Sequence, residues 1–155
     1  MIPKLLTLFR NIVLFSMIGF CANLYAQDLK QHRWENRILI VKTTYPKSKQ
    51  FQAQLNQIKN AASELIERKF VLYTIIEEDF TFINYKNLTL NNVGKLHGKL
   101  AKIVNNKSEF EVILIGLDGV VKLQQKNVLT KTKLFNKVDS MPMRRSEMRR
   151  KKNDE

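Results

Sequence analysis

The side chains with the clearest capacity for chemistry are arginines near the end of the chain. Arg144 and Arg145 precede Glu147, and Arg149 and Arg150 follow it. A guanidinium group forms planar, bidentate hydrogen bonds to carboxylate, phosphate or sulfate groups. These arginines are therefore candidates for binding an anionic ligand. The alternative is that Arg144 or Arg145 pairs with an acid of the domain and docks this end of the chain on it, while Glu147 makes the converse contact.

Further candidate residues lie earlier in the chain. The segment Arg-Trp-Glu-Asn-Arg begins at Arg33, and Asp118 and Lys122 lie in a predicted hairpin. We interpret Trp34 as a packing residue before a ligand platform, and Asp118 as a turn residue before a ligand contact. The complete candidate binding set is Arg33, Trp34, Arg37, Asp118, Lys122, Arg144, Arg145 and Glu147. None of these residues is assigned a catalytic role.

Thiol chemistry is excluded from nearly the whole chain, because Cys21 is its single cysteine. A thiol oxidoreductase places a cysteine of lowered pKa after its first strand, at the N-terminus of a helix. The corresponding residues here, 43–48, read Thr-Thr-Tyr-Pro-Lys-Ser and contain no sulfur. We therefore expect no thiol oxidoreductase activity.

Metal and cofactor sites also lack support in the sequence. We interpret the two histidines, His32 and His97, as ordinary surface residues rather than metal ligands. The acidic run at residues 77–79 suits a solvated or lysine-paired strand end. No Gly-x-Gly-x-x-Gly, P-loop or Gly-x-Ser-x-Gly motif occurs. We expect neither a metal nor a cofactor.

Residues 1–26 have the features of a secretory signal peptide. Lys4 and Arg10 form a positive start, residues 12–24 are largely apolar, and Ala26 is a small residue at the expected cleavage point. The protein is then periplasmic or secreted. Two alternatives are an uncleaved N-terminal membrane anchor and lipidation of Cys21.

The composition fits one globular domain with a strong positive charge. The chain has 155 residues, of which 44% are hydrophobic and 26% charged. Its formal net charge is +13, and loss of Lys4 and Arg10 would leave 25 basic and 14 acidic residues, a charge of +11. Such an excess favours anionic partners, namely nucleic acid, acidic lipid or acidic polysaccharide, although it also serves solubility alone.

The hydrophobic pattern predicts alternating strands and helices. Strands are expected at residues 37–44 and 70–77 and in a hairpin at 110–123, and helices at 47–68, 91–104 and from 130 to the proline at 142. Asp118-Gly119 predicts a tight primed turn between the hairpin strands. Residues 78–90 suit an extra strand or a packed loop.

This order predicts an α/β, thioredoxin-like architecture: a mixed four-stranded sheet with helices on both faces. The first two strands are expected to be parallel, and the hairpin antiparallel. Residues 27–143 form the domain and 144–155 a basic C-terminal tail, with residues 151–155 disordered. Met141 and Met143 are expected to pack against the domain, and Pro142 to turn the chain.

Three segments resemble the domain family DUF4174. They are Arg-Trp-Glu-Asn-Arg from residue 33, Leu-Ile-Gly-Leu-Asp-Gly from residue 114 with Lys122, and Asp-Ser-Met-Pro-Met-Arg-Arg-Ser-Glu-Met-Arg-Arg from residue 139. The resemblance covers about residues 29–150. It implies a thioredoxin-superfamily domain, related to domains of vertebrate secreted sushi-repeat and matrix proteins. It implies no particular activity.

We therefore expect an exported, non-catalytic binding module with a protein or anionic envelope or extracellular partner. One alternative is an enzyme with a non-thiol Arg/Asp/Glu site, which a pocket where Arg33 or Arg37 meets Arg144 and Glu147 would favour. The other is a charge-driven binder of anionic polymer or lipid. Nucleic acid is disfavoured, because export removes it from reach and the tail lacks aromatic residues for base stacking.

Overall fold

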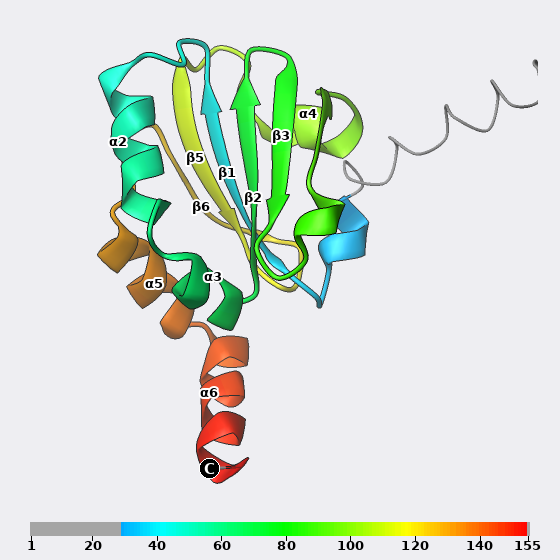
Figure 1. Cartoon of the computed structure of the whole chain (residues 1–155), viewed down its shortest axis with the longest axis vertical. Helices are drawn as coiled ribbons and strands as arrows, with labels where there is room; N and C mark the ends of the chain where they lie inside the picture. The colour runs from blue at the N-terminus through cyan, green and yellow to red at the C-terminus, as the bar shows by residue number, and fades with distance from the viewer. Residues whose placement is uncertain (1–28, 155) are drawn as a thin grey trace, which may run out of the picture.

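The centre of the fold is a six-stranded sheet with the order β4-β3-β2-β1-β5-β6, seen in a computed structural model that describes residues 29–154 (Figure 1). The strands are β1 (Arg37–Thr43), β2 (Phe70–Ile76), β3 (Asp79–Asn84), β4 (Asn92–Lys95), β5 (Phe110–Ile115) and β6 (Val121–Gln125). β1 and β2 are parallel, and all other neighbouring strands are antiparallel. The structure is therefore α/β with a mixed sheet.

β1 and β5 are buried along their whole length. Leu39 pairs with Leu114 and Val41 with Val112, and none of these side chains is more than 1% exposed. Continuous apolar runs of this kind favour strands that are covered on both faces. The strands predicted at residues 37–44 and in the hairpin at 110–123 are therefore confirmed as β1 and β5, and they lie side by side within the sheet.

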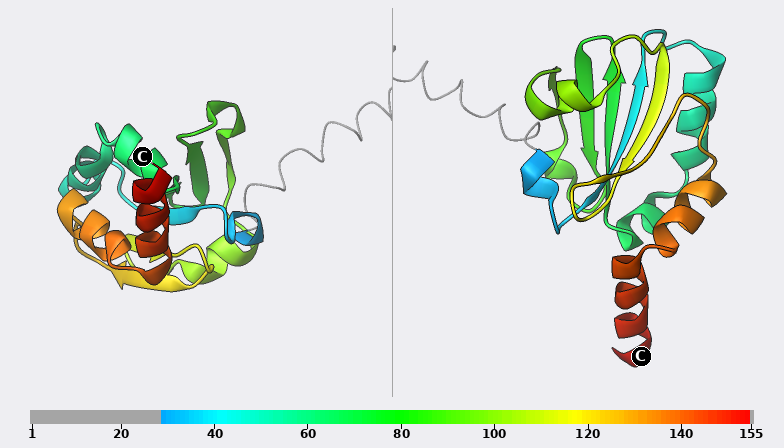
Figure 2. Two further views of the ribbon diagram at one scale, coloured as in Figure 1. Left: turned by 90° about the horizontal axis from the view of Figure 1, so that it is seen from below. Right: turned by 180° about the vertical axis from the view of Figure 1, so that it is seen from behind.

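Helices cover both faces of the sheet. One face carries α2 (Lys49–Ile58), α3 (Ala62–Glu67) and α5 (Lys131–Asp139), and the other carries α4 (Gly98–Ile103) and the 3-10 helix η1 (Leu29–His32) (Figures 1 and 2). Each face has its own core cluster. Thr130 is the N-cap of α5, because its side chain accepts a hydrogen bond from the Lys133 N–H.

The sheet has six strands rather than the predicted four, because residues 79–95 add β3 and β4 beyond β2. Phe80 and Phe82 are buried while their neighbours Asp79 and Thr81 are exposed, as expected for an edge region with one covered face. At Gly94, a Cβ would lie 2.8 Å from Cε1 of Phe80, so this strand needs a glycine there. Only Gly98–Ile103 of the predicted helix at 91–104 is helical.

The helix predicted over residues 47–68 is divided. α2 ends at Ile58 and α3 begins at Ala62, with Asn60 between them. Asparagine competes for backbone hydrogen bonds and favours turns over helix interiors. The apolar spacing is nevertheless preserved, because Phe51, Ile58 and Leu65 all join one core cluster.

The β5–β6 hairpin has a longer connection than the predicted two-residue turn. The Gly119 N–H donates to the Gly116 carbonyl at 3.0 Å, and Gly119 has a φ of +76°. A type I turn followed by a left-handed residue produces a bulge. The pairing register accordingly shifts between Leu114 and Ile115.

The C-terminal segment forms a helix, α6 (Pro142–Asp154), that projects from the body of the fold (Figures 1 and 2). Pro142 turns the chain as predicted and occupies the first helical position, where its missing N–H has little cost. The prediction of disorder was wrong for residues 151–154, which continue α6. The predicted signal peptide, with Cys21, lies outside the described residues. Between residues 29 and 154, no helix is long and apolar enough to cross a membrane.

Candidate functional site

Arg37 is the buried charge around which the candidate site is built. It is the first residue of β1, and its side chain is 1% exposed. Its Nη1 donates to the backbone carbonyl of Arg68 at 2.9 Å and to Oε2 of Glu147 at 3.2 Å. The guanidinium therefore joins the start of the central strand to the end of α3 and to α6.

The other edge of the Arg37 guanidinium has no partner. Nε and Nη2 are buried, and no acceptor for either atom is found within residues 29–154. Burial lowers the pKa of Arg37, and the nearby Glu147 carboxylate opposes this effect. Because a guanidinium remains protonated in proteins, the site holds a buried cation with two donors in need of an acceptor.

Arg144 ties α6 to the body of the domain. Its side chain is 5% exposed, and it donates to Oε1 of Glu67 at 2.7 Å and to Oδ1 of Asp139 at 3.2 Å. Arg68 binds the same Asp139 carboxylate with two nitrogens, at 2.8 and 3.0 Å. Arg144 therefore has the docking role that was one of the two alternatives for the arginine-rich end.

These ion pairs change the titration of the two carboxyl groups. The hydrogen bond from Arg144 lowers the pKa of Glu67. Burial opposes ionisation of Asp139, but hydrogen bonds from Arg68 and Arg144 outweigh it and lower the pKa of Asp139. Both carboxylates are therefore ionised near neutral pH.

The β5–β6 turn forms the opposite side of the site. Oδ1 of Asp118 accepts a hydrogen bond from the Val120 N–H at 3.1 Å, and Oδ2 accepts one from Nζ of Lys122 at 2.5 Å. Burial opposes ionisation of Asp118, but the Lys122 hydrogen bond lowers its pKa. Asp118 is thus both a turn residue and a fixed negative charge.

Arg33 and Trp34 lie behind this turn. The Trp34 N–H donates to the Leu117 carbonyl at 2.6 Å, and Trp34 has a φ of +71°. The guanidinium carbon of Arg33 lies 5.1 Å from the centre of the indole ring, which is a cation–π contact. Trp34 is 54% exposed, so it is not a core packing residue.

A pocket of about 390 Å³ lies between the β5–β6 turn and the junction of α5 with α6. We call it the Arg37 pocket. Three cationic residues line it, Arg37, Lys122 and Lys137, together with the carboxylate of Asp118 and the apolar residues Leu117, Met141 and Met143. Segment 140–143 also places the N-terminal end of α6 at the pocket, which adds the positive end of a helix dipole.

The structure thus unites most of the predicted set but not all of it. Arg37, Asp118 and Lys122 line the Arg37 pocket, and Glu147 and Arg144 lie behind Arg37. Arg145 is exposed and lies with Met148, Arg149 and Lys152 on another face of α6. Met141 packs on the core as predicted, whereas Met143 is 40% exposed and lines the pocket.

Sequence reasoning missed Lys137 as a site residue. Lys137 is an exposed member of α5, and only the packing of α5 against the β5–β6 hairpin brings it to the pocket. Its neighbour Val138 joins the core cluster. The sequence predicts a helix at these residues, but it does not indicate which elements lie beside the exposed side of that helix.

The histidines and acidic residues form no group of three or more that could hold a metal ion within the described residues. The interpretation of both histidines as surface residues was wrong for His32, which is 5% exposed. Its Nε2 lies 2.9 Å from the Tyr73 hydroxyl. In the acidic run, Asp79 pairs with Lys95 at 2.9 Å.

Comparison with known proteins identifies the family. The model of a family described as a domain of unknown function, DUF4174, matches residues 28–147, and the chain therefore belongs to this family. The match includes all eight candidate residues, from Arg33 to Glu147. No curated protein and no solved structure is significantly similar to the chain.

Proposed function

We propose that this DUF4174 protein is an exported, non-catalytic, thioredoxin-like module that binds an anionic ligand in the Arg37 pocket. The observation that carries this proposal is the unpartnered edge of the Arg37 guanidinium. Nε and Nη2 are both buried, and the residue lines a pocket large enough for a small molecule. Small-ligand sites usually have volumes of about 300–1,000 Å³.

The geometry of the free edge suits a group with two adjacent oxygens. Nε and Nη2 are neighbouring donors on one side of the planar guanidinium, and such a fork matches the two oxygens of a carboxylate, phosphate or sulfate. Lys122, Lys137 and the N-terminus of α6 would add positive potential. Binding would supply the acceptors that Arg37 lacks.

The pocket lining also indicates what the rest of the ligand resembles. Leu117, Met141 and Met143 provide apolar surface, and methionine side chains adapt well to ligands of varied shape. An organic anion with an apolar part, such as an aromatic or aliphatic carboxylate, would use both kinds of lining. A bare inorganic ion would use only the cationic side.

A binding role fits the carboxylates better than catalysis does. Arg37 and Arg144 both contact Glu147. This arrangement favours the alternative function, an enzyme with a non-thiol site. However, Glu147 is held by cations on three sides, and Asp118 is ionised and bonded to Lys122. The lowered pKa of Asp118 does not suit a general acid, which needs a raised pKa.

The order of four strands supports the thioredoxin-like part of the proposal. β2-β1-β5-β6 contains one parallel pair and a terminal antiparallel hairpin, with β3 and β4 added beside β2. The apolar segment before Ala26 supports export. The proposed relation to domains of vertebrate secreted sushi-repeat and matrix proteins fits the same location.

Calorimetric titration with benzoate, acetate and inorganic phosphate would test the proposal. We expect saturable binding, tightest for benzoate because it has an apolar ring. Arg37→Lys keeps the charge but loses the fork, and we expect it to weaken binding by about tenfold or more.

Two further variants separate binding from folding. Lys137→Glu reverses an exposed charge at the pocket, and Lys133→Glu makes the same change on α5 away from the residues that line it. We expect only Lys137→Glu to weaken binding, with both variants melting like the parent. Equal affinities of the parent, Arg37→Lys and Lys137→Glu would refute the proposal.

A further inference from the structure

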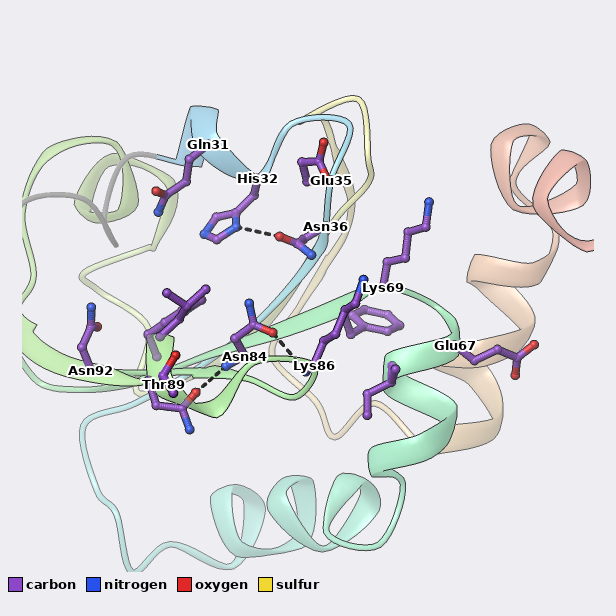
Figure 3. A pocket seen from close by; sticks show the side chains of 15 residues that line it. Gln31, His32, Glu35, Asn36, Glu67, Lys69, Asn84, Lys86, Thr89 and Asn92 are labelled. Carbon is purple, nitrogen blue, oxygen red and sulfur yellow. Dashed lines mark hydrogen bonds between the residues drawn. The ribbon is translucent and has the colours of Figure 1, made fainter.

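A second and larger pocket, of about 890 Å³, shares no lining residue with the Arg37 pocket. η1, the end of α3, β3 and the loop between β3 and β4 surround it (Figure 3). Five side-chain amides line it. We call it the amide pocket, and four of its amides belong to Gln31, Asn36, Asn84 and Asn92.

Two of the amides are held in a fixed orientation by bonds inside the protein. Oδ1 of Asn84 accepts hydrogen bonds from the backbone N–H groups of Lys86 and Asn87, both at 3.0 Å. Oδ1 of Asn36 lies 3.2 Å from Nδ1 of His32. With their oxygens engaged in this way, both residues present their NH₂ groups to the space between them (Figure 3).

A buried chain of hydrogen bonds supports the orientation of Asn36. The Tyr73 hydroxyl lies 2.9 Å from Nε2 of His32, and burial raises the pKa of Tyr73, so this hydroxyl is protonated. Tyr73 can donate to Nε2, and Nδ1 then faces the Asn36 oxygen as a donor. His32 then donates to the Asn36 oxygen and keeps the Asn36 NH₂ group available to a ligand.

The lining of the amide pocket also includes a hydrogen-bond acceptor that no donor contacts within the described residues. Oδ1 of Asn92 is buried, and residues 29–154 contain no partner for it. Gln31 points into the same space from η1 (Figure 3). The lining therefore offers both donors and acceptors on uncharged groups.

Besides His32, four charged residues line the pocket: Glu35, Glu67 and Lys69 are directed elsewhere or already paired, and Lys86 adds one cation to the lining. Lys69 binds Glu147 at 3.3 Å, and Glu67 binds Arg144 at 2.7 Å. The carboxylate of Glu35 and the ammonium group of Lys69 both point away from the amides (Figure 3). Phe70 and Phe82 supply an apolar floor.

We propose that the amide pocket binds a neutral saccharide segment of a glycan. A sugar hydroxyl both donates and accepts, as an amide does, and needs no charged partner. The C–H faces of a sugar ring suit the apolar floor. The pocket volume lies toward the upper end of the range of about 300–1,000 Å³ for small-ligand sites, so it has room for more than one small ion.

Titration of the full chain with cellotriose, maltotriose and chitotriose, followed by NMR of the side-chain amide signals, would test this inference. We expect at least one of these neutral trisaccharides to shift the NH₂ signals of Asn36 and Asn84 saturably. Trigalacturonic acid and inorganic phosphate serve as charged probes. The absence of any saturable shift with the three neutral sugars, or shifts with the charged probes alone, would overturn the inference.

Two matched variants complete the test. Asn84→Asp keeps the oxygen that bonds the loop but removes the NH₂ donors, whereas Asn56→Asp makes the same change at an exposed position of α2. We expect Asn84→Asp to weaken saccharide binding by about tenfold and Asn56→Asp to leave it unchanged. Lys137→Glu, an exposed change at the Arg37 pocket only, should also leave it unchanged, so failure at one pocket is distinguishable from failure at the other. Equal affinity of Asn84→Asp and the parent would contradict the proposal.

Discussion

The Arg37 guanidinium at the start of β1 donates to the Glu147 carboxylate in α6 at 3.2 Å, across 110 residues of sequence. The same carboxylate lies 3.3 Å from Nζ of Lys69 and 3.6 Å from Nη1 of Arg144. Glu147 therefore neutralises part of a cationic cluster and fixes one edge of Arg37. The other edge of Arg37, formed by Nε and Nη2, is buried without an acceptor, which is the basis of the proposed anion site.

Arg144 and Arg145 form a natural pair of variants for the docking of α6. Arg144→Ala should lower the free energy of unfolding by about 1–3 kcal/mol, because Glu67 and Asp139 lose a buried charged donor. Arg145→Ala should change it by no more than about 0.5 kcal/mol, because Arg145 is exposed. Urea unfolding of both variants would measure this, and equal effects would show that Arg144 does not tie α6 to the domain.

The same ion pairs predict loss of stability in acid. The folded-state pKa values of Glu67 and Asp139 lie below their ordinary values of 4.5 and 3.8, so their stabilising contribution is present above these values. It is lost as the pH falls through the lower folded-state values. Between about pH 6 and pH 3, we expect the urea midpoint of the parent to fall further than that of Arg144→Ala. A parallel fall in both proteins would contradict this assignment.

Because β5 is buried within the sheet, truncating one of its side chains should strongly lower the free energy of unfolding. Leu114 is fully buried in β5 opposite Leu39, and Leu114→Ala should cost about 2–5 kcal/mol. Val120→Ala, at a 55% exposed position beyond the same strand, should cost about 0.5 kcal/mol or less. Denaturant midpoints would compare them. An unchanged midpoint for Leu114→Ala would show that β5 does not occupy the centre of the sheet.

Export makes a prediction about the mature N-terminus. Protein recovered from the producing cells should begin near Gln27, because Ala26 supplies the small residue that signal peptidase requires. Ala26→Phe should block this cleavage. N-terminal sequencing would identify the start, and a chain beginning at a lipidated Cys21 would indicate the lipoprotein alternative. Intact Met1 in a cytosolic fraction would rule out export.

The predictable part of the fold is the part where local pattern and tertiary environment agree. β1, β2 and β5 are long apolar runs, and their burial on both faces needs no other information. β4 contains Gly94 and has only one partly covered face, so its sequence resembles a loop or a helix start as much as a strand. Its pairing with β3 comes from tertiary contact with Phe80, which local propensity does not encode.

The candidate site, like the fold, has residues that could be predicted from the sequence and residues that could not. Arg37, Arg144 and Glu147 could be selected because a guanidinium forms planar, bidentate contacts to anionic groups and Glu147 can pair with one. Lys137 and the amides of Asn36 and Asn84 could not, since isolated lysines and asparagines are common on surfaces. The orientation of these amides depends on buried partners such as His32, whose burial the sequence did not reveal.

The Nε–H signal of Arg37 in a proton–nitrogen NMR spectrum tests the anion site most directly, because Nε is one of the two donors without a partner. During titration with benzoate, we expect this signal to move downfield and saturate, together with the backbone signal of Met143 at the start of α6. Arg145, on another face of α6, supplies an internal control whose Nε–H signal should stay in place. An Arg37 signal that stays in place at saturating benzoate, or one that moves only as much as that of Arg145, would contradict the assignment of Arg37 as the anion-binding residue.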